Sequence, residues 1–279
     1  MSQFEPRIPR DLAVRLGEEA VAISKAGKYV GPAGPVDISE QIAAAVKKTR
    51  YYPPEHYHMP GYRGPHQTRF EVTNETTLSA HRRHQAKGHN VVSLNFASAT
   101  HPGGGFLSGA RAQEEYLCRS SALYLTLKDC PMYGYHRKHE DDDVCLFSDA
   151  IIYSPDVPVF RNDDHSLLHY PHLASFISCA APIAKHVDLD FELAYLPEFL
   201  NCRITKILSV AQWNSHNSLI LGAWGCGAYG NDGHEIADIF YKALTLEFAG
   251  SFKEVTFAIV DTSPERRFIG PFAQRFAAQ

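Results

Sequence analysis

The sequence predicts an α/β fold in which helices cover both faces of a central sheet, a three-layer α/β/α sandwich. Two observations support this class. From residue 69 onward, short segments rich in β-branched and apolar residues alternate with segments whose apolar residues recur at helical spacing. Two glycine-rich stretches directly follow predicted strands, which is where ligands bind in open α/β sheets. The 279 residues, 44% of them hydrophobic, allow one large α/β domain or two smaller ones.

The first 65 residues differ in pattern from the rest of the chain. Residues 10–26 and 38–50 have the apolar spacing and the helix formers of two helices, and the turn-rich stretch 27–37 links them. Residues 51–66 are dense in Pro, Gly, Tyr and His, which predicts an ordered irregular segment packed on the protein rather than a solvated linker.

The alternation of strands and helices begins at residue 69. We expect Asn74 to cap the first helix of this region and Gly88 to end it. Residues 149–161 predict two short extended pieces about a proline. The other predicted strands cover residues 69–73, 90–97, 174–180, 217–223 and 253–261, and the predicted helices cover residues 74–88, 110–127, 201–215 and 233–248.

Composition and charge exclude several classes of function. The net charge of −4 argues against a broad basic surface, so we expect no sequence-specific nucleic-acid partner. No apolar run reaches the roughly 18 residues that span a bilayer, and the N-terminus lacks the apolar stretch of a signal peptide, so we expect no membrane partner and a cytoplasmic location. The six cysteines form no CxxC pair and the fifteen histidines show no ligand spacing, which predicts free thiols and no metal.

The first glycine-rich loop contains Gly103, Gly104 and Gly105, shortly after the predicted strand 90–97. Three glycines leave the backbone free to approach a ligand closely, and their N–H groups form an anion-binding concavity with the following helix N-terminus. Taken alone, three glycines are more often a flexible turn.

The sequence Gln113-Glu114-Glu115 follows this loop after a seven-residue spacer, near the start of a predicted helix. Two adjacent glutamates are usually a solvated helix face. Adjacent helical residues point about 100° apart, so the two carboxylates cannot flank one bond symmetrically. We therefore expect one glutamate to carry out proton chemistry and the other to hold substrate hydroxyls.

The second glycine-rich loop has the pattern GxGxxG at Gly225, Gly227 and Gly230, between a predicted strand and a helix. Its backbone amides could form a second phosphate-binding site. It lacks the Lys-Ser/Thr ending of a P-loop, and its late position makes a dinucleotide-coenzyme fingerprint a weak alternative. No base is indicated beside Cys226, so its small size explains its presence better than a nucleophilic role.

The string NFASATHPGGGFLSGARAQEE resembles the signature of poly(ADP-ribose) glycohydrolases, in particular the compact bacterial-type branch. The loop GAWGCGAYGN resembles the diphosphate-binding loop of that family and of macrodomains generally. The resemblance implies a macrodomain-like catalytic domain with a mixed central sheet over residues 66–279, and an N-terminal helical extension, residues 1–65, packed on it. It also implies hydrolysis of ribose–ribose bonds in poly(ADP-ribose) or on ADP-ribosylated protein, with ADP-ribose released and no cofactor or metal.

The resemblance assigns roles to particular residues. Glu115 would be the catalytic acid, and Glu114 would hydrogen-bond ribose hydroxyls. Tyr229 would pack over the distal ribose, and Asn95 and Ala97 would contact that ribose from the strand end. The remaining substrate-binding residues would be Gly103, Gly104 and Gly105 at the distal ribose and diphosphate, Gln113 beside the glutamates, and Gly225, Cys226, Gly227, Ala228, Gly230 and Asn231 around the diphosphate.

The chemistry of a ribosyl–ribose bond suits these residues. Its alkoxide leaving group needs a general acid, and an oxocarbenium-like transition state is stabilised by the carboxylate formed after proton donation. Two other functions stay open: a non-catalytic ADP-ribose-binding module, which would not need the paired glutamates, and a hydrolase of another ADP-ribosyl linkage. Arg266, Arg267 and Phe268 are candidates to border the adenine side, with an ordinary C-terminal cap as the alternative. Residues 51–65 are expected to cover the adenine-ribose end of the substrate.

Overall fold

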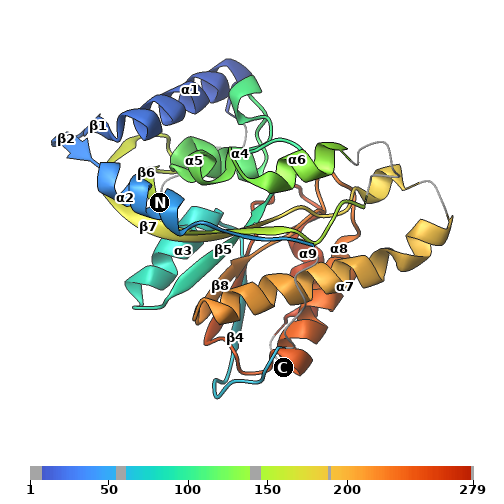
Figure 1. Cartoon of the computed structure of the whole chain (residues 1–279). Helices are drawn as coiled ribbons and strands as arrows, with labels where there is room; N and C mark the ends of the chain where they lie inside the picture. Colours follow the sequence, from blue (N-terminus) through green and yellow to red (C-terminus); the bar gives the residue numbers. More distant parts are fainter. Residues whose placement is uncertain (1–7, 55–60, 139–145, 188–189, 278–279) are drawn as a thin grey trace.

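Seven strands form the central sheet of the protein, for which a computed structural model describes residues 8–54, 61–138, 146–187 and 190–277. Five neighbouring strands of the sheet are parallel to one another, and the two strands at the other edge add antiparallel pairs, so the predicted mixed sheet is confirmed. The spatial order is β3 (Arg50–Tyr52), β6 (Ile151–Arg161), β7 (Leu167–Cys179), β5 (Val91–Phe96), β8 (Ser218–Leu221), β9 (Glu254–Ala258) and β4 (Arg69–Thr73) (Figure 1).

Helices cover both faces of this sheet, as the predicted three-layer sandwich requires. One face packs against α7 (Asp190–Trp213), α8 (Gly233–Lys242) and α9 (Ile269–Arg275). The opposite face carries α1 (Arg10–Ala26), α2 (Ser39–Lys48), α3 (Thr77–Ala86), α4 (Gln113–Ser120), α5 (Leu123–Leu127) and α6 (Pro131–Lys138). Figure 1 shows β5 and β8 between α3 on one side and α7 and α8 on the other.

Alternate residues of the inner strands enter the two separate cores. In β7, Ile177 packs with α7 and α8, whereas its neighbour Phe176 packs with the helices of the other face. In β8, Leu219 and Leu221 belong to the first core, and Ile220 packs against α3. Because both faces are covered there, β8 and the second half of β7 are mostly apolar, which is why the sequence shows short apolar runs at these positions.

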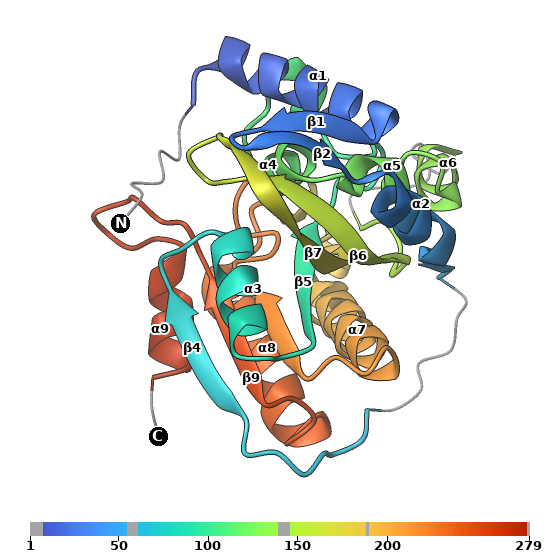
Figure 2. The ribbon, with the colours of Figure 1, turned by 90° about the vertical axis from the view of Figure 1, so that its left-hand side faces the viewer.

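The N-terminal segment is more regular than the sequence indicated. Its two helices form as predicted, but residues 28–37, expected to be a turn-rich link, form an antiparallel hairpin of β1 (Lys28–Gly31) and β2 (Gly34–Asp37). β3 pairs with β6 and so adds an edge strand to the main sheet. The segment before residue 66 is thus continuous with the sheet, and a domain boundary at residue 65 stays a prediction. α1 and the β1–β2 hairpin lie together at one end of the molecule (Figures 1 and 2).

Several predicted boundaries were wrong. The helix expected over residues 110–127 is two helices, because Ser121 leaves the helix to bridge Val159 of β6. The extended pieces expected over residues 149–161 are one strand with an irregular register. Thr76, not Asn74, caps α3: its hydroxyl accepts from the Ser79 N–H at 3.1 Å. Gly88 follows the end of α3 with a φ of +78°, as its predicted role requires.

The amide of Asn74 is used elsewhere, since its Nδ2 donates to the Asp261 carbonyl at 2.7 Å. Neither α6 nor α9 was predicted from the sequence, and α7 begins at Asp190, eleven residues before its predicted start at residue 201. The five cysteines in the described part of the chain are free thiols, and Cys145 lies outside it. No helix in the described ranges is both long enough and apolar enough to cross a membrane.

Candidate active site

A cavity of about 470 Å³ opens at the carboxyl ends of three neighbouring parallel strands, β5, β8 and β9. Both glycine-rich loops leave the sheet at this edge, one after β5 and the other after β8. The position is the one at which α/β sheets bind ligands. The strand ends that line the cavity are Phe96, Ala97 and Ser98 after β5, Ala223, Trp224 and Gly225 after β8, and Ala258, Ile259 and Val260 at the end of β9.

The triple-glycine loop folds back against the start of α4. Gly103 and Gly104 have φ values of +73° and +58°, a region that residues with a Cβ rarely adopt. A Cβ at Gly104 would lie 2.3 Å from Oε1 of Glu115, which is closer than any real contact. The backbone N–H of Gly105 donates to the same oxygen at 3.0 Å. Glycine is therefore required here so that the backbone can reach the carboxylate.

Glu114 is buried, with 3% of its surface exposed, and is held from two sides. Its Oε2 accepts from the Ser98 N–H at 2.7 Å, and its Oε1 accepts from Nδ2 of Asn95 at 3.3 Å. Burial, followed by the neighbouring Glu115 carboxylate, raises the pKa of Glu114 to about 8, although these hydrogen bonds oppose the shift. The carboxyl group of Glu114 therefore holds a proton near neutral pH.

Glu115 differs from Glu114 in having one oxygen uncommitted. Its Oε1 is held by Gly105, whereas Oε2 is buried and has no hydrogen-bond partner among the described residues. Both glutamates line the cavity. An oriented carboxyl group with one free oxygen at the wall of a cavity is suited to transfer a proton to or from a bound molecule.

Gln113, Asn95 and Ala97 form the support behind the glutamates. The Gln113 amide joins the start of α4 to the end of β5: it accepts from the Phe96 N–H at 2.9 Å and donates to the Leu94 carbonyl at 2.8 Å. Asn95 is fully buried and donates to Ser178 as well as to Glu114. Ala97 and Gln113 line the cavity, while Asn95 lies behind its wall.

The second glycine loop contributes four residues to the wall of the cavity. Gly225, Gly227, Ala228 and Tyr229 line the cavity, and Gly225 has a φ of +75°. Cys226 is buried and its Sγ lies 3.6 Å from the Trp224 carbonyl. Its thiol thus faces the protein, which agrees with a role for its small size.

Asn231 holds the end of this loop in place. Its Nδ2 donates to the Pro182 carbonyl at 2.8 Å and to the Gly225 carbonyl at 3.0 Å, and a Cβ at Gly225 would lie 2.5 Å from the same nitrogen. Gly230 closes the loop with a φ of +76°. The side chain of Asn231 therefore shapes the loop from behind rather than lining the cavity.

Tyr229 connects the two loops. Burial, followed by the charge of Glu114, raises the pKa of Tyr229 to about 12, and its hydroxyl group interacts with Ser98 and with the backbone of Ala99. The phenol is therefore neutral across the physiological range. Tyr229 thus reaches from the second glycine loop to the segment that follows β5.

Two features of the site were missed by the sequence analysis. Thr76 and Thr77 at the start of α3 line the cavity. Asp163 joins the start of α3 to α4. It accepts hydrogen bonds from the hydroxyl groups of Thr76 at 2.9 Å and Ser79 at 2.8 Å, and also from that of Tyr116. The only sequence signal was a run of threonines at a helix start, and nothing in the sequence linked it to Asp163.

The expectation that residues 51–65 cover the substrate's adenine-ribose end stays a prediction, because only part of this segment is described. Residues 51–65 do not cover the cavity over their described part: Tyr51 and Tyr52 pair with β6, while Gly61 and Gly64 bond to Glu247 and Ala249 beyond α8. Residues 55–60 lie outside the described residues. Phe268 lines the cavity, whereas Arg266 and Arg267, the other candidates for that end, do not.

The three-layer sandwich with a mixed sheet, and the cavity between two glycine loops at the strand ends, define a macrodomain-like protein. Residues 17–162 match the family described as microbial-type PARG, catalytic domain. The chain therefore belongs to the microbial-type poly(ADP-ribose) glycohydrolase family.

Solved structures agree with this assignment. The chain is 42% identical to poly(ADP-ribose) glycohydrolase from Thermomonospora curvata bound to the inhibitor ADP-HPD, with a TM-score of 0.87 over 95% of this chain and 100% of that one. It is 39% identical to the enzyme from Deinococcus radiodurans in complex with ADP-ribose, with a TM-score of 0.81 over 87% of this chain and 99% of that one. No curated protein matches the chain significantly.

Proposed function

We propose that the protein is a glycosidase that hydrolyses ribose–ribose O-glycosidic bonds in poly(ADP-ribose) and releases ADP-ribose, with Glu115 as the general acid and base. The observation that carries this proposal is the uncommitted, buried Oε2 of Glu115 at the wall of a cavity between two glycine loops. A module that only binds ADP-ribose has no use for a buried carboxyl group held in this way. The D. radiodurans relative was solved with ADP-ribose, which supports the ligand class.

The ligand is placed by the two loops. The diphosphate lies over the backbone amides of residues 225–230, because such amides bind anions without a cation. The distal ribose points toward Glu114 and Glu115, with Gly103–Gly105 beneath it and the ring of Tyr229 over it. Within this scheme Gln113 acts by fixing the start of α4, which carries the glutamates, and Asn95 acts through Glu114. Cys226 and Asn231 act by keeping the loop in shape.

The reaction starts with transfer of a proton from the Glu115 carboxyl group to the oxygen of the leaving ribose. The bond from the anomeric carbon to that oxygen breaks, and positive charge develops on the distal ribose. The carboxylate formed on Glu115 stabilises this charge and then accepts a proton from the water that attacks the anomeric carbon. Glu114 holds the ribose hydroxyl groups throughout, and its own proton keeps the net charge of the pair low.

The substrate is poly(ADP-ribose), free or on an ADP-ribosylated protein, and the product is ADP-ribose. We expect the protein to act in the cytoplasm, and cell fractionation followed by detection of the protein would test this location.

The decisive experiment is to incubate the wild-type protein with poly(ADP-ribose), and separately with mono-ADP-ribosylated acceptors, and to measure free ADP-ribose. Release from the polymer alone supports the proposal. Release from the mono-ADP-ribosylated acceptor alone would identify another linkage as the substrate, and binding without release would identify a binding module.

The Glu115→Gln variant tests the acid. Glutamine keeps the size of the side chain but has no acidic proton, so turnover should fall by about two or more orders of magnitude while ADP-ribose affinity changes little. Glu114→Gln should lower turnover too, partly through weaker binding, because its hydroxyl contacts exist in the ground state. Turnover like that of the wild type in Glu115→Gln would refute the assigned mechanism.

A further inference from the structure

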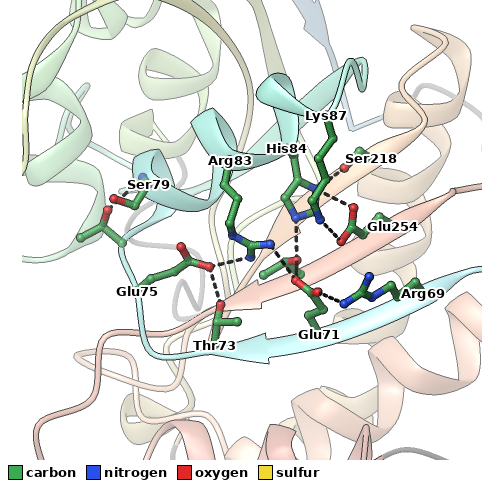
Figure 3. Close-up of polar contacts among 12 residues, drawn as sticks. Arg69, Glu71, Thr73, Glu75, Ser79, Arg83, His84, Lys87, Ser218 and Glu254 are labelled. Carbon is green, nitrogen blue, oxygen red and sulfur yellow. Dashed lines mark hydrogen bonds and ion pairs between the residues drawn. The ribbon is translucent and has the colours of Figure 1, made fainter. Parts of the chain in front are cut away.

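A second polar cluster lies at the opposite end of the sheet from the cavity. His84 is in the last turn of α3, His89 comes just before β5, and Glu254 is the first residue of β9. The three offer one ligand atom each within 4.8 Å of one another. Figure 3 shows His84, Lys87 and Glu254 turned toward each other between α3 and the strands. We propose that His84, His89 and Glu254 bind one zinc ion, which clips α3 to the amino ends of β5 and β9.

The distances are close to those of a tetrahedral zinc site. Nδ1 of His89 lies 3.4 Å from Oε2 of Glu254, and Nδ1 of His84 lies 3.8 Å from the same oxygen. Zinc bonds of about 2.0–2.2 Å at tetrahedral angles place ligand atoms roughly 3.4 Å apart. Both distances to Glu254 are at or near this spacing, and all three ligand atoms lie within 4.8 Å of one another, so an ion fits between them once the side chains draw together. Two imidazoles and one carboxylate, with water at the fourth position, form a common ligand set for zinc.

Burial distinguishes this cluster from a chance gathering of surface side chains. His84 is fully buried and Glu254 is 4% exposed. Nδ1 of His89 is also buried, yet it has no hydrogen-bond partner among the described residues. A buried polar nitrogen without a partner is costly, and coordination of a cation would satisfy it.

The surroundings of His84 orient it as a ligand. Its Nε2 lies 2.9 Å from Oγ1 of Thr256, so a proton on Nε2 can be donated there, which leaves the Nδ1 lone pair facing Glu254. Ser218 now lies 2.6 Å from this Nδ1, and its hydroxyl group must turn away when the ion binds.

Lys87 is the competitor of the ion. Its Nζ lies 2.6 Å from Oε1 of Glu254 and balances that carboxylate. The other nearby charges are already paired: Arg83 contacts Glu71 and Glu75, and Arg69 contacts Glu71 (Figure 3). Lys87 is 37% exposed and can move into solvent when zinc takes over the charge of Glu254. The lysine therefore weakens the site without blocking it.

Zinc binding is tested by isothermal titration calorimetry of the full chain with zinc chloride, together with thermal unfolding. We expect one ion per chain, and a rise in Tm of about 5 °C at a hundredfold excess over Kd. Magnesium should give no rise, because it prefers oxygen ligands in octahedral geometry. Absence of zinc binding by the wild type would overturn the proposal.

Two variants and a control locate the ion. His89→Ala removes a ligand that makes no side-chain hydrogen bond at Nδ1, so it should weaken zinc binding more than about tenfold while the metal-free Tm stays near that of the wild type. His234→Ala removes an exposed histidine of α8 and should leave zinc affinity unchanged. Lys87→Met should tighten binding, since it removes the competing charge. If His89→Ala binds zinc as the wild type does, or if Lys87→Met weakens binding, the ion lies elsewhere and the proposal is wrong.

Discussion

Gly104 and Glu115 touch so closely that a side chain at position 104 would occupy the place of the Glu115 carboxyl group. The Cβ of an alanine there would lie 2.3 Å from Oε1 of Glu115 and 3.1 Å from Oε2 of Glu114. The φ of +58° at this position adds backbone strain for any residue with a Cβ. The glycine loop is thus shaped around the two glutamates as well as around the ligand.

Gly104→Ala should therefore abolish most of the activity while the protein remains folded. We expect turnover to fall by about tenfold or more, since misplacement of a catalytic group by an ångström is costly. The measurement is initial-rate release of ADP-ribose from poly(ADP-ribose), with circular dichroism to confirm folding. Gly134→Ala is the matched control, because Gly134 lies in α6 and its Cβ would meet nothing within 4 Å. Equal activities of the two variants would show that the loop tolerates displacement of Glu115.

The activity should decline on the alkaline side as Glu114 loses its proton. Burial and the neighbouring Glu115 raise the pKa of Glu114 to about 8. Above that value both members of the pair are charged, and the substrate's diphosphate adds further negative charge nearby. We expect kcat/KM to fall above about pH 8, and Glu114→Gln to remove this decline even though its maximal rate is lower. A decline of the same shape in Glu114→Gln would assign it to another group.

The same carboxyl group makes stability depend on pH. Glu114 ionises near its ordinary value of 4.5 in the unfolded chain, but at about 8 in the folded protein. Between these values the folded state binds one more proton than the unfolded state, so the stability contributed by the protonated form is full below pH 4.5 and is lost as the pH rises toward about 8. Urea unfolding of Glu114→Gln at several pH values should show a flatter profile than the wild type. A steeper decline in the variant would contradict the assignment.

Asp163 should be important for stability because it accepts three hydroxyl hydrogen bonds, from Thr76, Ser79 and Tyr116. Hydrogen bonds to a charged group contribute about 1.5–3 kcal/mol, so Asp163→Asn should lower the free energy of unfolding by about that amount. Asp164→Asn is the control, since Asp164 is exposed and bonds only to Ser166, a turn that asparagine can also make. Urea titration distinguishes the two, and similar midpoints would show that the Asp163 network contributes little.

Phe268 should contribute to affinity at the adenine end of the cavity, which it lines. Stacking of a base on an aromatic ring is worth about 1–3 kcal/mol, so Phe268→Ala should weaken ADP-ribose and AMP by similar factors of about ten. Phe199→Ala, on the exposed side of α7, serves as the control.

The wild-type protein should bind ADP-ribose with much higher affinity than AMP, because AMP lacks the distal ribose. Calorimetry with both ligands measures this difference. Equal affinities would mean that the site makes no favourable contact with the distal ribose.

The sequence was most informative where local spacing determines structure. The glycine loops, the Gln113-Glu114-Glu115 start of a helix and the strand–helix alternation are short-range patterns, and they were predicted correctly in kind. The hairpin of β1 and β2 was missed because its strands have only four residues each and little apolar alternation. The break at Ser121 was missed because its cause is a bridge to Val159, a contact made only in the folded chain.

Polar clusters were missed for the same reason, because their contacts are made only in the folded chain. Asp163 and Thr76 belong to one network, and His89 and Glu254 to another, yet each pair is distant in the sequence. No spacing rule for ligands or for hydrogen-bond partners covers such separations, because the partners are brought together by sheet pairing. Asn74 illustrates a local miss: its side chain suits a helix cap, but a tertiary bond to Asp261 was available and Thr76 took the cap.

The adjacency of β5 and β8 bears on how the protein folds. Val91 pairs with Ser218, so these neighbouring strands come from distant parts of the chain, and their parallel register forms only after a long loop has closed. The two glycine loops meet only then, and no early intermediate with local structure alone contains the cavity. A ligand that bridges both loops can therefore bind only after β5 and β8 have paired, so it stabilises the native state and not the transition state of folding. It slows unfolding and leaves the refolding rate unchanged.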